Sequence, residues 1–173
     1  MPHVYLSLGS NRERERNIRA ALDALSDGFG ALEISSVYES EAVGFDGSNF
    51  YNLVVGLECT QSLAELSACL KQIEDDNGRD RSGPRFSGRT LDIDILTYGE
   101  LDHPRDGVQV PRDEITENAF VLRPLAEIAP DRQHPVLQQT YAELWRAYDR
   151  PQKLWPIDFI WRDQLISRAS AEH

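Results

Sequence analysis

The chain has 173 residues, the length of a single domain, and 40% of them are hydrophobic, enough to form a core without disulfides. Its 18 basic and 29 acidic side chains give a net charge of −11, which argues against a broad affinity for nucleic acid or anionic membranes. No apolar run long enough to span a bilayer and no secretory signal pattern occurs, and the two cysteines, Cys59 and Cys69, fit no zinc spacing. We therefore expect a soluble, reduced, cytoplasmic protein.

Strand and helix patterns alternate along the first hundred residues. Apolar residues at helical spacing predict one helix that ends at Gly28 and Gly30 and a second that Ser62 caps. The polar, glycine-containing segments 41–49 and 76–89 are expected to be loops. Alternating hydrophobic residues predict strands over residues 4–8, 32–38, 51–60 and 90–98.

The order β-α-β-β-α-β predicts a ferredoxin-like α+β sandwich, in which two helices cover one face of an antiparallel sheet. A loop over 99–115 and further helical patterns over 119–128 and 140–148 follow. We expect residues 1–150 to form one domain and the aromatic tail, 151–173, to pack on it. Because this fold carries many functions, the function has to be sought in a site.

Two aspartates lie on the last predicted strand. Alternate side chains of a strand share a face, so Asp92 and Asp94 point together to one side, with Cα atoms roughly 6–7 Å apart. Two carboxylates at this spacing repel each other unless a cation lies between them, and Mg²⁺ prefers such oxygen ligands together with water and phosphate. Alone, such a pair also fits the solvated face of an edge strand.

An arginine cluster precedes these aspartates. Sixteen of the 18 basic residues are arginine, and four of them fall within eleven residues. The planar guanidinium suits phosphate oxygens, although an arginine run by itself is also typical of a solvated surface. Together, the carboxylate pair and the arginines indicate phosphoryl transfer. The four arginines are Arg79, Arg81, Arg85 and Arg89.

Residues 89–96, RTLDIDIL, resemble the signature of the 6-hydroxymethyl-7,8-dihydropterin pyrophosphokinases of folate biosynthesis. Further motifs in the same order extend the resemblance over residues 3–148. The resemblance implies that pyrophosphate passes from ATP to the hydroxymethyl group of the pterin and that AMP is released, with two Mg²⁺ ions. The further motifs are LGSN at 8–11, VYES at 37–40, FYN at 50–52 and FVLRPL at 120–125.

The resemblance also implies roles for single residues. Asp92 and Asp94 would hold the Mg²⁺ ions, and Arg79 and Arg89 would act as catalytic residues on the phosphates. Phe50 could equally be an ordinary core residue, as could Phe120. The implied pterin-binding residues are Ser40, Val43, Phe50, Asn52 and Phe120. The implied ATP-binding residues are Glu74, Arg79, Arg81, Arg85, Arg89, Ile95 and Arg112, of which Glu74 could equally be a solvated residue at a helix end.

Asn52 is the polar residue in this set that is hardest to explain by packing alone, because a buried amide needs partners. The chain departs from the family pattern mainly on the nucleotide side. Arg112 stands where the family usually has histidine, and Asn118 where it often has arginine. Gly107 and Gly88 also replace typical family residues.

Other function classes remain open at this point. A divergent relative that binds a pterin or a nucleotide with weak or no turnover would explain the departures. An RNA-recognition domain shares the topology, but the net charge of −11 argues against it. A generic metal-dependent phosphohydrolase would leave Asn52 without a role. We expect the partners to be a pterin alcohol and ATP, without nucleic acid or membrane, and we favour a monomer. The histidines are given no role: His3, His103, His134 and His173.

Overall fold

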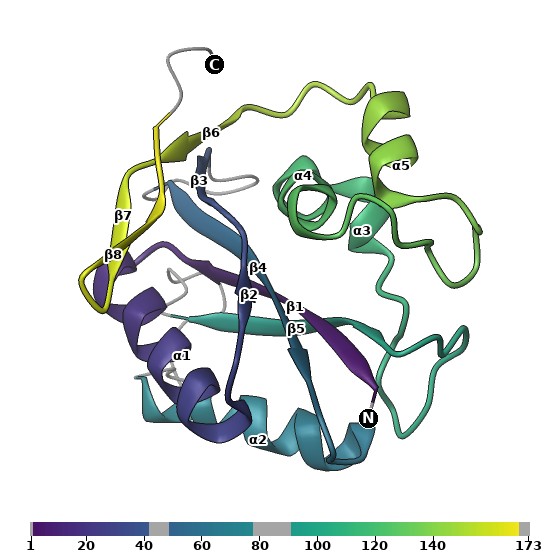
Figure 1. Ribbon diagram of the computed structural model, residues 1–173, viewed down its shortest axis with the longest axis horizontal. Coiled ribbons are helices and arrows are strands. Elements are labelled where there is room, and N and C mark those ends of the chain that lie inside the picture. The colour runs from purple at the N-terminus through teal and green to yellow at the C-terminus, as the bar shows by residue number, and fades with distance from the viewer. Residues whose placement is uncertain (1, 42–48, 78–90, 170–173) are drawn as a thin grey trace, which may run out of the picture.

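The computed structural model of the chain describes residues 2–41, 49–77 and 91–169 (Figure 1). The main sheet is antiparallel throughout and has the strand order β5-β1-β4-β3-β6, with β2 also paired to β4. The four strands predicted from the sequence lie in this sheet in the order expected of a ferredoxin-like fold. The strands are β1 (His3–Ser10), β2 (Glu33–Ile34), β3 (Val37–Ser40), β4 (Phe50–Glu58), β5 (Asp92–Tyr98) and β6 (Leu154–Ile157).

Helices cover both faces of this sheet (Figure 1). Two of them, α1 (Arg14–Phe29) and α2 (Leu63–Asp76), pack on one face over the larger core. The ferredoxin-like α+β sandwich with additional C-terminal helices is therefore confirmed. The prediction of a loop over 99–115 is wrong at its end, because a short helix begins within this segment. The helices on the other face are α3 (Glu114–Glu117), α4 (Ala119–Ile128) and α5 (Tyr141–Ala147).

The alternation of β1 separates the two cores. Leu6 and Leu8 are fully buried against α1 and α2, whereas Tyr5 joins the core under α4. The helix α2 begins as predicted at Ser62, whose hydroxyl accepts a hydrogen bond from the Glu65 amide while the Glu65 carboxylate accepts one from the Ser62 amide. This capping box satisfies two amides that the helix itself leaves without partners.

The strand predicted over 32–38 is divided into β2 and β3. Between them, the Ser35 hydroxyl accepts a hydrogen bond from the Val54 amide at 2.9 Å, where the regular ladder would use a backbone carbonyl. The Ser36 amide and hydroxyl both donate to the carboxylate of Glu127 on α4. Local side-chain hydrogen bonds of this kind compete with a regular ladder, and they were not evident from the alternation of apolar residues.

The chain after α5 returns to the sheet. β6 pairs with the outer edge of β3, and a hairpin of β7 (Phe159–Trp161) and β8 (Gln164–Ser167) lies beside α1. The Trp161 indole donates to Asp23 of α1 at 3.0 Å, and Arg162 forms an ion pair with the same carboxylate. None of the helices in the described part of the chain has the length and hydropathy needed to cross a membrane.

Candidate active site

The two aspartates lie on β5, the edge strand of the sheet, and face the layer that contains α4. In the antiparallel register Asp92 stands opposite Gly9 of β1, and Asp94 opposite Ser7. Gly9 in turn stands opposite Asn52 of β4. Residues opposite each other in register share a face, so Asp92, Gly9 and Asn52 form a row on one surface of the sheet. The carboxylate and the amide at the ends of this row are two strand spacings apart, about 10 Å. The glycine between them carries no side chain, which keeps this surface open.

A cavity of about 230 Å³ lies over this row, between the sheet and α4. On the sheet side it is bounded by Gly9, Asn52 and the two aspartates, and Phe120 of α4 forms part of its opposite wall. Among the described residues that line it, six are neutral and four are acidic. The complete lining is Ser7, Gly9, Ser40, Glu41, Phe50, Asn52, Asp92, Asp94, Glu114 and Phe120.

Asn52 and Ser40 form a buried polar pair in this cavity. Each side chain is 95% buried, and the Asn52 amide nitrogen donates to the Ser40 hydroxyl at 2.7 Å. This bond fixes the orientation of the amide, so that its carbonyl and its second N–H can meet a ligand. Ser40 is thus one partner of the buried Asn52 amide, and the role of Asn52 toward a pterin stays a prediction.

The strand that carries Ser40 is tied to α4. The Tyr38 hydroxyl donates to the Glu127 carboxylate at 2.7 Å, and the guanidinium of Arg123 lies 4.9 Å from the centre of the Tyr38 ring. Burial, followed by the hydrogen bond to Glu127, raises the pKa of Tyr38, so the phenol keeps its proton and remains a donor. The two walls of the smaller cavity are thus joined beside it.

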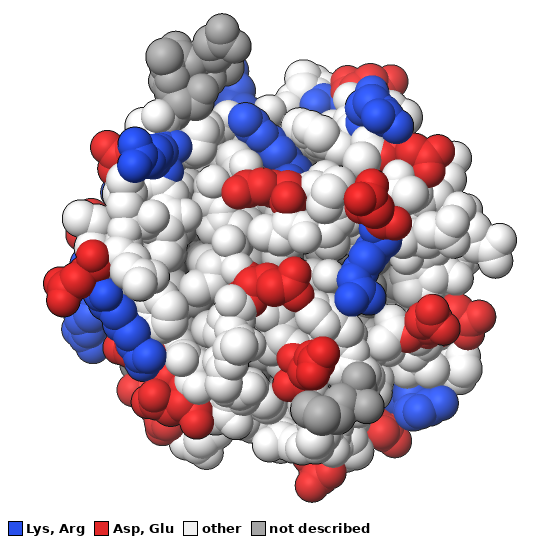
Figure 2. Space-filling view, viewed as in Figure 1, with Lys and Arg blue, Asp and Glu red and all other residues white. Residues whose placement is uncertain are grey.

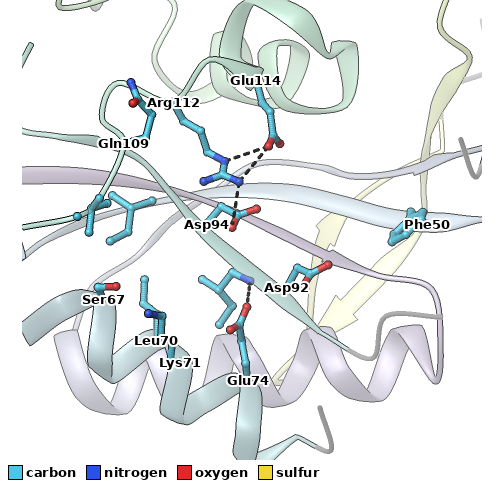
Figure 3. Close-up of a pocket in the computed structure, with 14 residues that line it drawn as sticks. Phe50, Ser67, Leu70, Lys71, Glu74, Asp92, Asp94, Gln109, Arg112 and Glu114 are labelled. Atoms are coloured by element: carbon cyan, nitrogen blue, oxygen red, sulfur yellow. Dashed lines mark hydrogen bonds and ion pairs between the residues drawn. The ribbon is translucent and has the colours of Figure 1, made fainter. Parts of the chain in front are cut away.

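A second, larger cavity of about 650 Å³ lies on the other side of the aspartates (Figure 3). It is formed by α2, β5 and the segment 107–114, and it is more open and more polar than the first. Lys71 and Arg112 supply its cations among the described residues. Four residues line both cavities: Phe50, Asp92, Asp94 and Glu114.

Arg112 lies beside Asp94 in the wall of the larger cavity (Figure 3). One guanidinium nitrogen lies 3.0 Å from Glu114 Oε1 and 3.6 Å from Asp94 Oδ1. Its backbone amide donates to the carbonyl of Leu96 at 2.9 Å, which fastens this segment to β5. All three side chains in this group are about one-third exposed, so the guanidinium can exchange a carboxylate for another anion at small cost.

Glu74 supports the strand between the aspartates. This residue, at the end of α2, is 92% buried, and its Oε2 accepts a hydrogen bond from the Ile93 amide at 2.8 Å. No further strand pairs with this edge of β5 among the described residues, and the Glu74 side chain occupies the hydrogen-bonding position of the Ile93 amide there. Glu74 was predicted to be either an ATP contact or a solvated residue at a helix end. The structure instead shows a buried residue that lines the larger cavity and also holds β5.

The donor set of this site fits Mg²⁺. Within residues 2–41, 49–77 and 91–169, no group of three or more histidine, cysteine or acidic side chains is arranged to hold a metal ion alone. Asp92 and Asp94 supply carboxylate oxygens on one surface beside two open cavities. Mg²⁺ is commonly held in this way, by one or two carboxylates, with water and substrate phosphate completing its shell.

Several predicted site residues lie outside the described part of the chain: Val43 and the arginines 79, 81, 85 and 89. Of the others, Ile95 lines the larger cavity together with Arg112, and Phe50 lines both cavities. The sequence reasoning missed Lys71 and Glu114. Lys71 stands three residues before Glu74 on the same helix, so helical spacing could have indicated it. Glu114 had no such signal, because it was assigned to a loop.

The face of the molecule seen in Figure 2 shows acidic side chains interspersed with separate basic ones. Among the described residues of that face, the basic groups do not merge into one continuous surface.

An antiparallel ferredoxin-like sheet, a carboxylate pair on its edge strand and a cavity on each side of that pair fit an enzyme that joins two substrates. The family model "7,8-dihydro-6-hydroxymethylpterin-pyrophosphokinase (HPPK)" matches residues 5–130. The chain therefore belongs to the HPPK family, the pyrophosphokinases of folate biosynthesis, and the predicted family and enzyme class are confirmed.

Individual relatives agree with the family match. The chain is 41% identical to the 2-amino-4-hydroxy-6-hydroxymethyldihydropteridine pyrophosphokinase of Pseudomonas aeruginosa, over 76% of this chain and 83% of that protein. It is 36% identical to the enzyme of the same name from Bacillus subtilis, over 72% of this chain and 77% of that one.

Solved structures show the same fold. The Plasmodium falciparum HPPK-DHPS with pterin and p-hydroxybenzoate superposes with a TM-score of 0.69 at 17% identity, over 98% of this chain. A second HPPK-DHPS, in complex with substrates, superposes with a TM-score of 0.72 at 13% identity, over 99% of this chain. The chain spans 48% of each of these longer proteins, so they support its fold and nothing about their remaining parts.

Proposed function

We propose that the smaller cavity binds the pterin alcohol, that the larger cavity binds ATP, and that Asp92 and Asp94 act between them. The single observation that carries this assignment is the position of the two aspartates, which line both cavities at once. A transfer between two substrates requires the reacting atoms of both to meet at one place, and the shared wall is where the two cavities adjoin.

The smaller cavity suits a flat heterocycle with polar edges. The Asn52 amide offers a donor and an acceptor in a fixed orientation, which matches a pterin edge that carries both. Phe50 and Phe120 supply aromatic faces for the rings, and Ser40 holds Asn52 in place. We include the backbone near Val43 in this subsite on the strength of the family resemblance.

The larger cavity suits a triphosphate. Arg112 and Lys71 bring positive charge to its wall, and Gln109 adds an amide. We infer that Arg79, Arg81, Arg85 and Arg89 contribute further contacts to the phosphates, and that Arg79 and Arg89 act on the transferring group. Ile95 and Glu74 complete the wall from β5 and α2.

In the proposed reaction the hydroxymethyl oxygen of the pterin forms a bond to the β-phosphorus of ATP. The bond from that phosphorus to the oxygen shared with the α-phosphorus breaks, AMP leaves with this oxygen, and the hydroxyl proton is released. The chain binds and orients the two substrates so that the hydroxyl faces the β-phosphorus, and Arg112 offers positive charge to the phosphate oxygens. Mg²⁺, held by Asp92 and Asp94, would neutralise charge on the triphosphate.

The measurement that tests this proposal is AMP formation from ATP, with and without 6-hydroxymethyl-7,8-dihydropterin, before and after removal of Mg²⁺ by a chelator. We expect AMP only when the pterin and Mg²⁺ are both present. Binding of the pterin without any AMP would contradict the proposal and identify a relative that binds without turnover.

We also propose that the enzyme acts as a monomer in the cytoplasm. The free thiols of Cys59 and Cys69 are consistent with a reducing compartment. Light scattering coupled to size-exclusion chromatography tests the monomer, and a dimeric mass would contradict it.

A further inference from the structure

The segment that follows α5 contacts two walls of the smaller cavity without lining it. It lies beyond residues 5–130, the part of the chain that the family model matches. Within a few residues it reaches first the start of α4, which carries Phe120, and then the outer edge of β3, which carries Ser40. The question is whether this segment only completes the sheet or also determines how the cavity is shaped.

Gln152 makes the contact to α4. Its side-chain oxygen accepts a hydrogen bond from the amide of Ala119, the first residue of α4, at 2.6 Å. The first amides of a helix have no partner within it, and a side chain at the N-cap ordinarily supplies one. Asn118 occupies the N-cap of α4 but makes no capping hydrogen bond with its side chain. A glutamine from a distant part of the chain therefore performs this task.

The same side chain also holds the residue before the cap. The Gln152 amide nitrogen donates to the carbonyl of Glu117 at 3.2 Å, and the Tyr148 hydroxyl donates to the same carbonyl at 2.8 Å. Glu117 is the last residue of α3, so these bonds fix the short connection between α3 and α4. Phe120 follows one residue after Ala119, and its position depends on where this connection is held.

Two residues further along, the chain pairs with β3. Leu154 of β6 stands opposite Ser40, which on its other side stands opposite Phe50 of β4. Without β6, the strand that carries Ser40 would be an exposed edge. Ser40 accepts the hydrogen bond that orients Asn52, so pairing of β6 supports the amide wall while Gln152 supports the aromatic wall.

We propose that Gln152 is a positioning residue for pterin binding, which sets the distance between Phe120 and the Ser40–Asn52 pair. This inference rests on the assignment of the smaller cavity to the pterin. Gln152 is absent from the described lining of both cavities, so its effect on the substrate is exerted through α4. Loss of its hydrogen bonds lets the start of α4 shift, which lowers pterin affinity more than ATP affinity, because Phe120 lines the smaller cavity and is not among the described residues of the larger one.

The test compares Gln152→Met, which keeps the length of the side chain but cannot make the two hydrogen bonds, with Gln152→Glu, which keeps the acceptor for the Ala119 amide. Gln164→Met, at an exposed position of β8, is the matched control. The readouts are the dissociation constant of the pterin by fluorescence titration, the KM of each substrate, kcat, and the melting temperature.

We expect Gln152→Met to raise the dissociation constant and the KM of the pterin about five- to tenfold, with the KM of ATP within about twofold of wild type. Gln152→Glu should recover part of this loss, and Gln164→Met should show none of it. An unchanged pterin affinity in a folded Gln152→Met variant would overturn the inference, as would a parallel rise in the KM of both substrates, which indicates general loosening.

Failure of the proposed function gives a different result. If wild type forms no AMP but binds the pterin, the assignment of the reaction falls, and the dissociation constants still decide the role of Gln152. If wild type does not bind the pterin, the role of Gln152 in pterin binding falls with it. If Gln152→Met does not fold, Gln152→Glu decides, because this variant has lost the amide that donates to the Glu117 carbonyl. An unchanged pterin affinity of Gln152→Glu would overturn the role of the Glu117 contact. A rise of its pterin dissociation constant without a rise of the KM of ATP would support that role.

Discussion

The two cavities differ in how they are built, although they share one wall. The smaller one lies over paired strands, and two polar residues of its wall, Ser40 and Asn52, are each 95% buried and are hydrogen-bonded to each other. The larger one is formed by a helix, an edge strand and the segment 107–114, and its cations, Lys71 and Arg112, reach solvent. A buried, orientation-fixed amide discriminates by hydrogen-bond pattern, because a mismatched ligand leaves it without partners. Cations that reach solvent select a ligand mainly by its charge, and salt screens their attraction for it.

The most severe way to break this arrangement is to alter the wall that the cavities share. Asp94→Asn keeps the shape of the side chain and removes a charge that lies on both cavities. Since metal-assisted charge neutralisation contributes several kcal/mol to such reactions, we expect kcat to fall about a thousandfold. Steady-state AMP release measures it, and calorimetric titration of Mg²⁺ in the presence of ATP should show weaker metal binding independently of turnover.

Asp102→Asn is the matched control, because Asp102 is exposed in the segment between β5 and α3 and lines neither cavity. Its kcat should equal that of wild type. If Asp94→Asn retains a kcat within tenfold of wild type, the shared wall is not where the reaction occurs.

Asn52→Leu breaks the smaller cavity alone. The substitution removes the amide from a site that is 95% buried and leaves both the Ser40 hydroxyl and the pterin edge without a partner. Unsatisfied buried groups cost about 1–3 kcal/mol each, so we expect the KM of the pterin to rise about thirtyfold or more. The KM of ATP should stay within about twofold, and both are obtained from initial rates. A comparable rise for ATP would show that the two cavities are not independent.

The sequence predicted the smaller cavity better than the larger one. The period-two alternation places Asp92 and Asp94 on one face of their strand, because a strand leaves a side chain only two directions. The register that aligns Asp92, Gly9 and Asn52 in one row is a property of pairing between three strands, and no single segment encodes it. Family resemblance supplied the rest of that subsite.

On the larger cavity the sequence reasoning could not separate structural from functional charges. Glu74 reads as a solvated residue at a helix end, because nothing in its neighbours shows that the edge of β5 comes to lie against it. The contact between Arg112 and Glu114 depends on a short helix that lacks an apolar period of its own. Gln152 escaped notice for the same reason, since its partners lie more than thirty residues away.

A milder change sharpens the comparison from the side of the larger cavity. Arg112→Ala removes a guanidinium that is one-third exposed and lies 3.6 Å from Asp94. An exposed charge contact contributes up to about 1 kcal/mol, so we expect the KM of ATP to rise about fivefold and to become less dependent on salt, with the pterin KM unchanged. Initial rates at two ionic strengths measure both effects. Arg146→Ala, exposed on α5, is the control, and an equal change there would remove Arg112 from the ATP site.

Gly9→Ala tests the open surface between Asp92 and Asn52. An added Cβ would lie 3.4 Å from the Asn52 amide oxygen, an ordinary contact, and would occupy space in the smaller cavity. The fold should tolerate it, whereas we expect the KM of the pterin to rise about fivefold because the ring loses room. Thermal unfolding and initial rates separate the two effects. A large loss of stability with unchanged pterin KM in the folded fraction would mean that Gly9 is required for strand packing and not for the substrate.

The smallest expected effect lies outside both cavities, at His134, for which no role was predicted. The side chain is 93% buried, and its Nδ1 accepts hydrogen bonds from the amides of Val136 and Leu137, each at 3.1 Å. Burial lowers the pKa of His134 below its usual value of 6.5, so the unfolded chain takes up a proton at a pH where the folded chain does not. Stability contributed by the neutral imidazole is therefore complete above pH 6.5 and is lost as the pH falls from there toward the lowered pKa.

His134→Asn keeps an acceptor near the same two amides and cannot take up this proton. We expect the free energy of unfolding of wild type to fall more than that of the variant between about pH 7.5 and about pH 5.5, as measured by chemical denaturation. Both proteins should have the same kcat and the same two KM values at neutral pH, because His134 lines neither catalytic cavity. Parallel pH profiles would show that His134 has the same pKa in the folded and the unfolded chain, and a change in either KM would show that the two cavities depend on a region at the far end of the sheet.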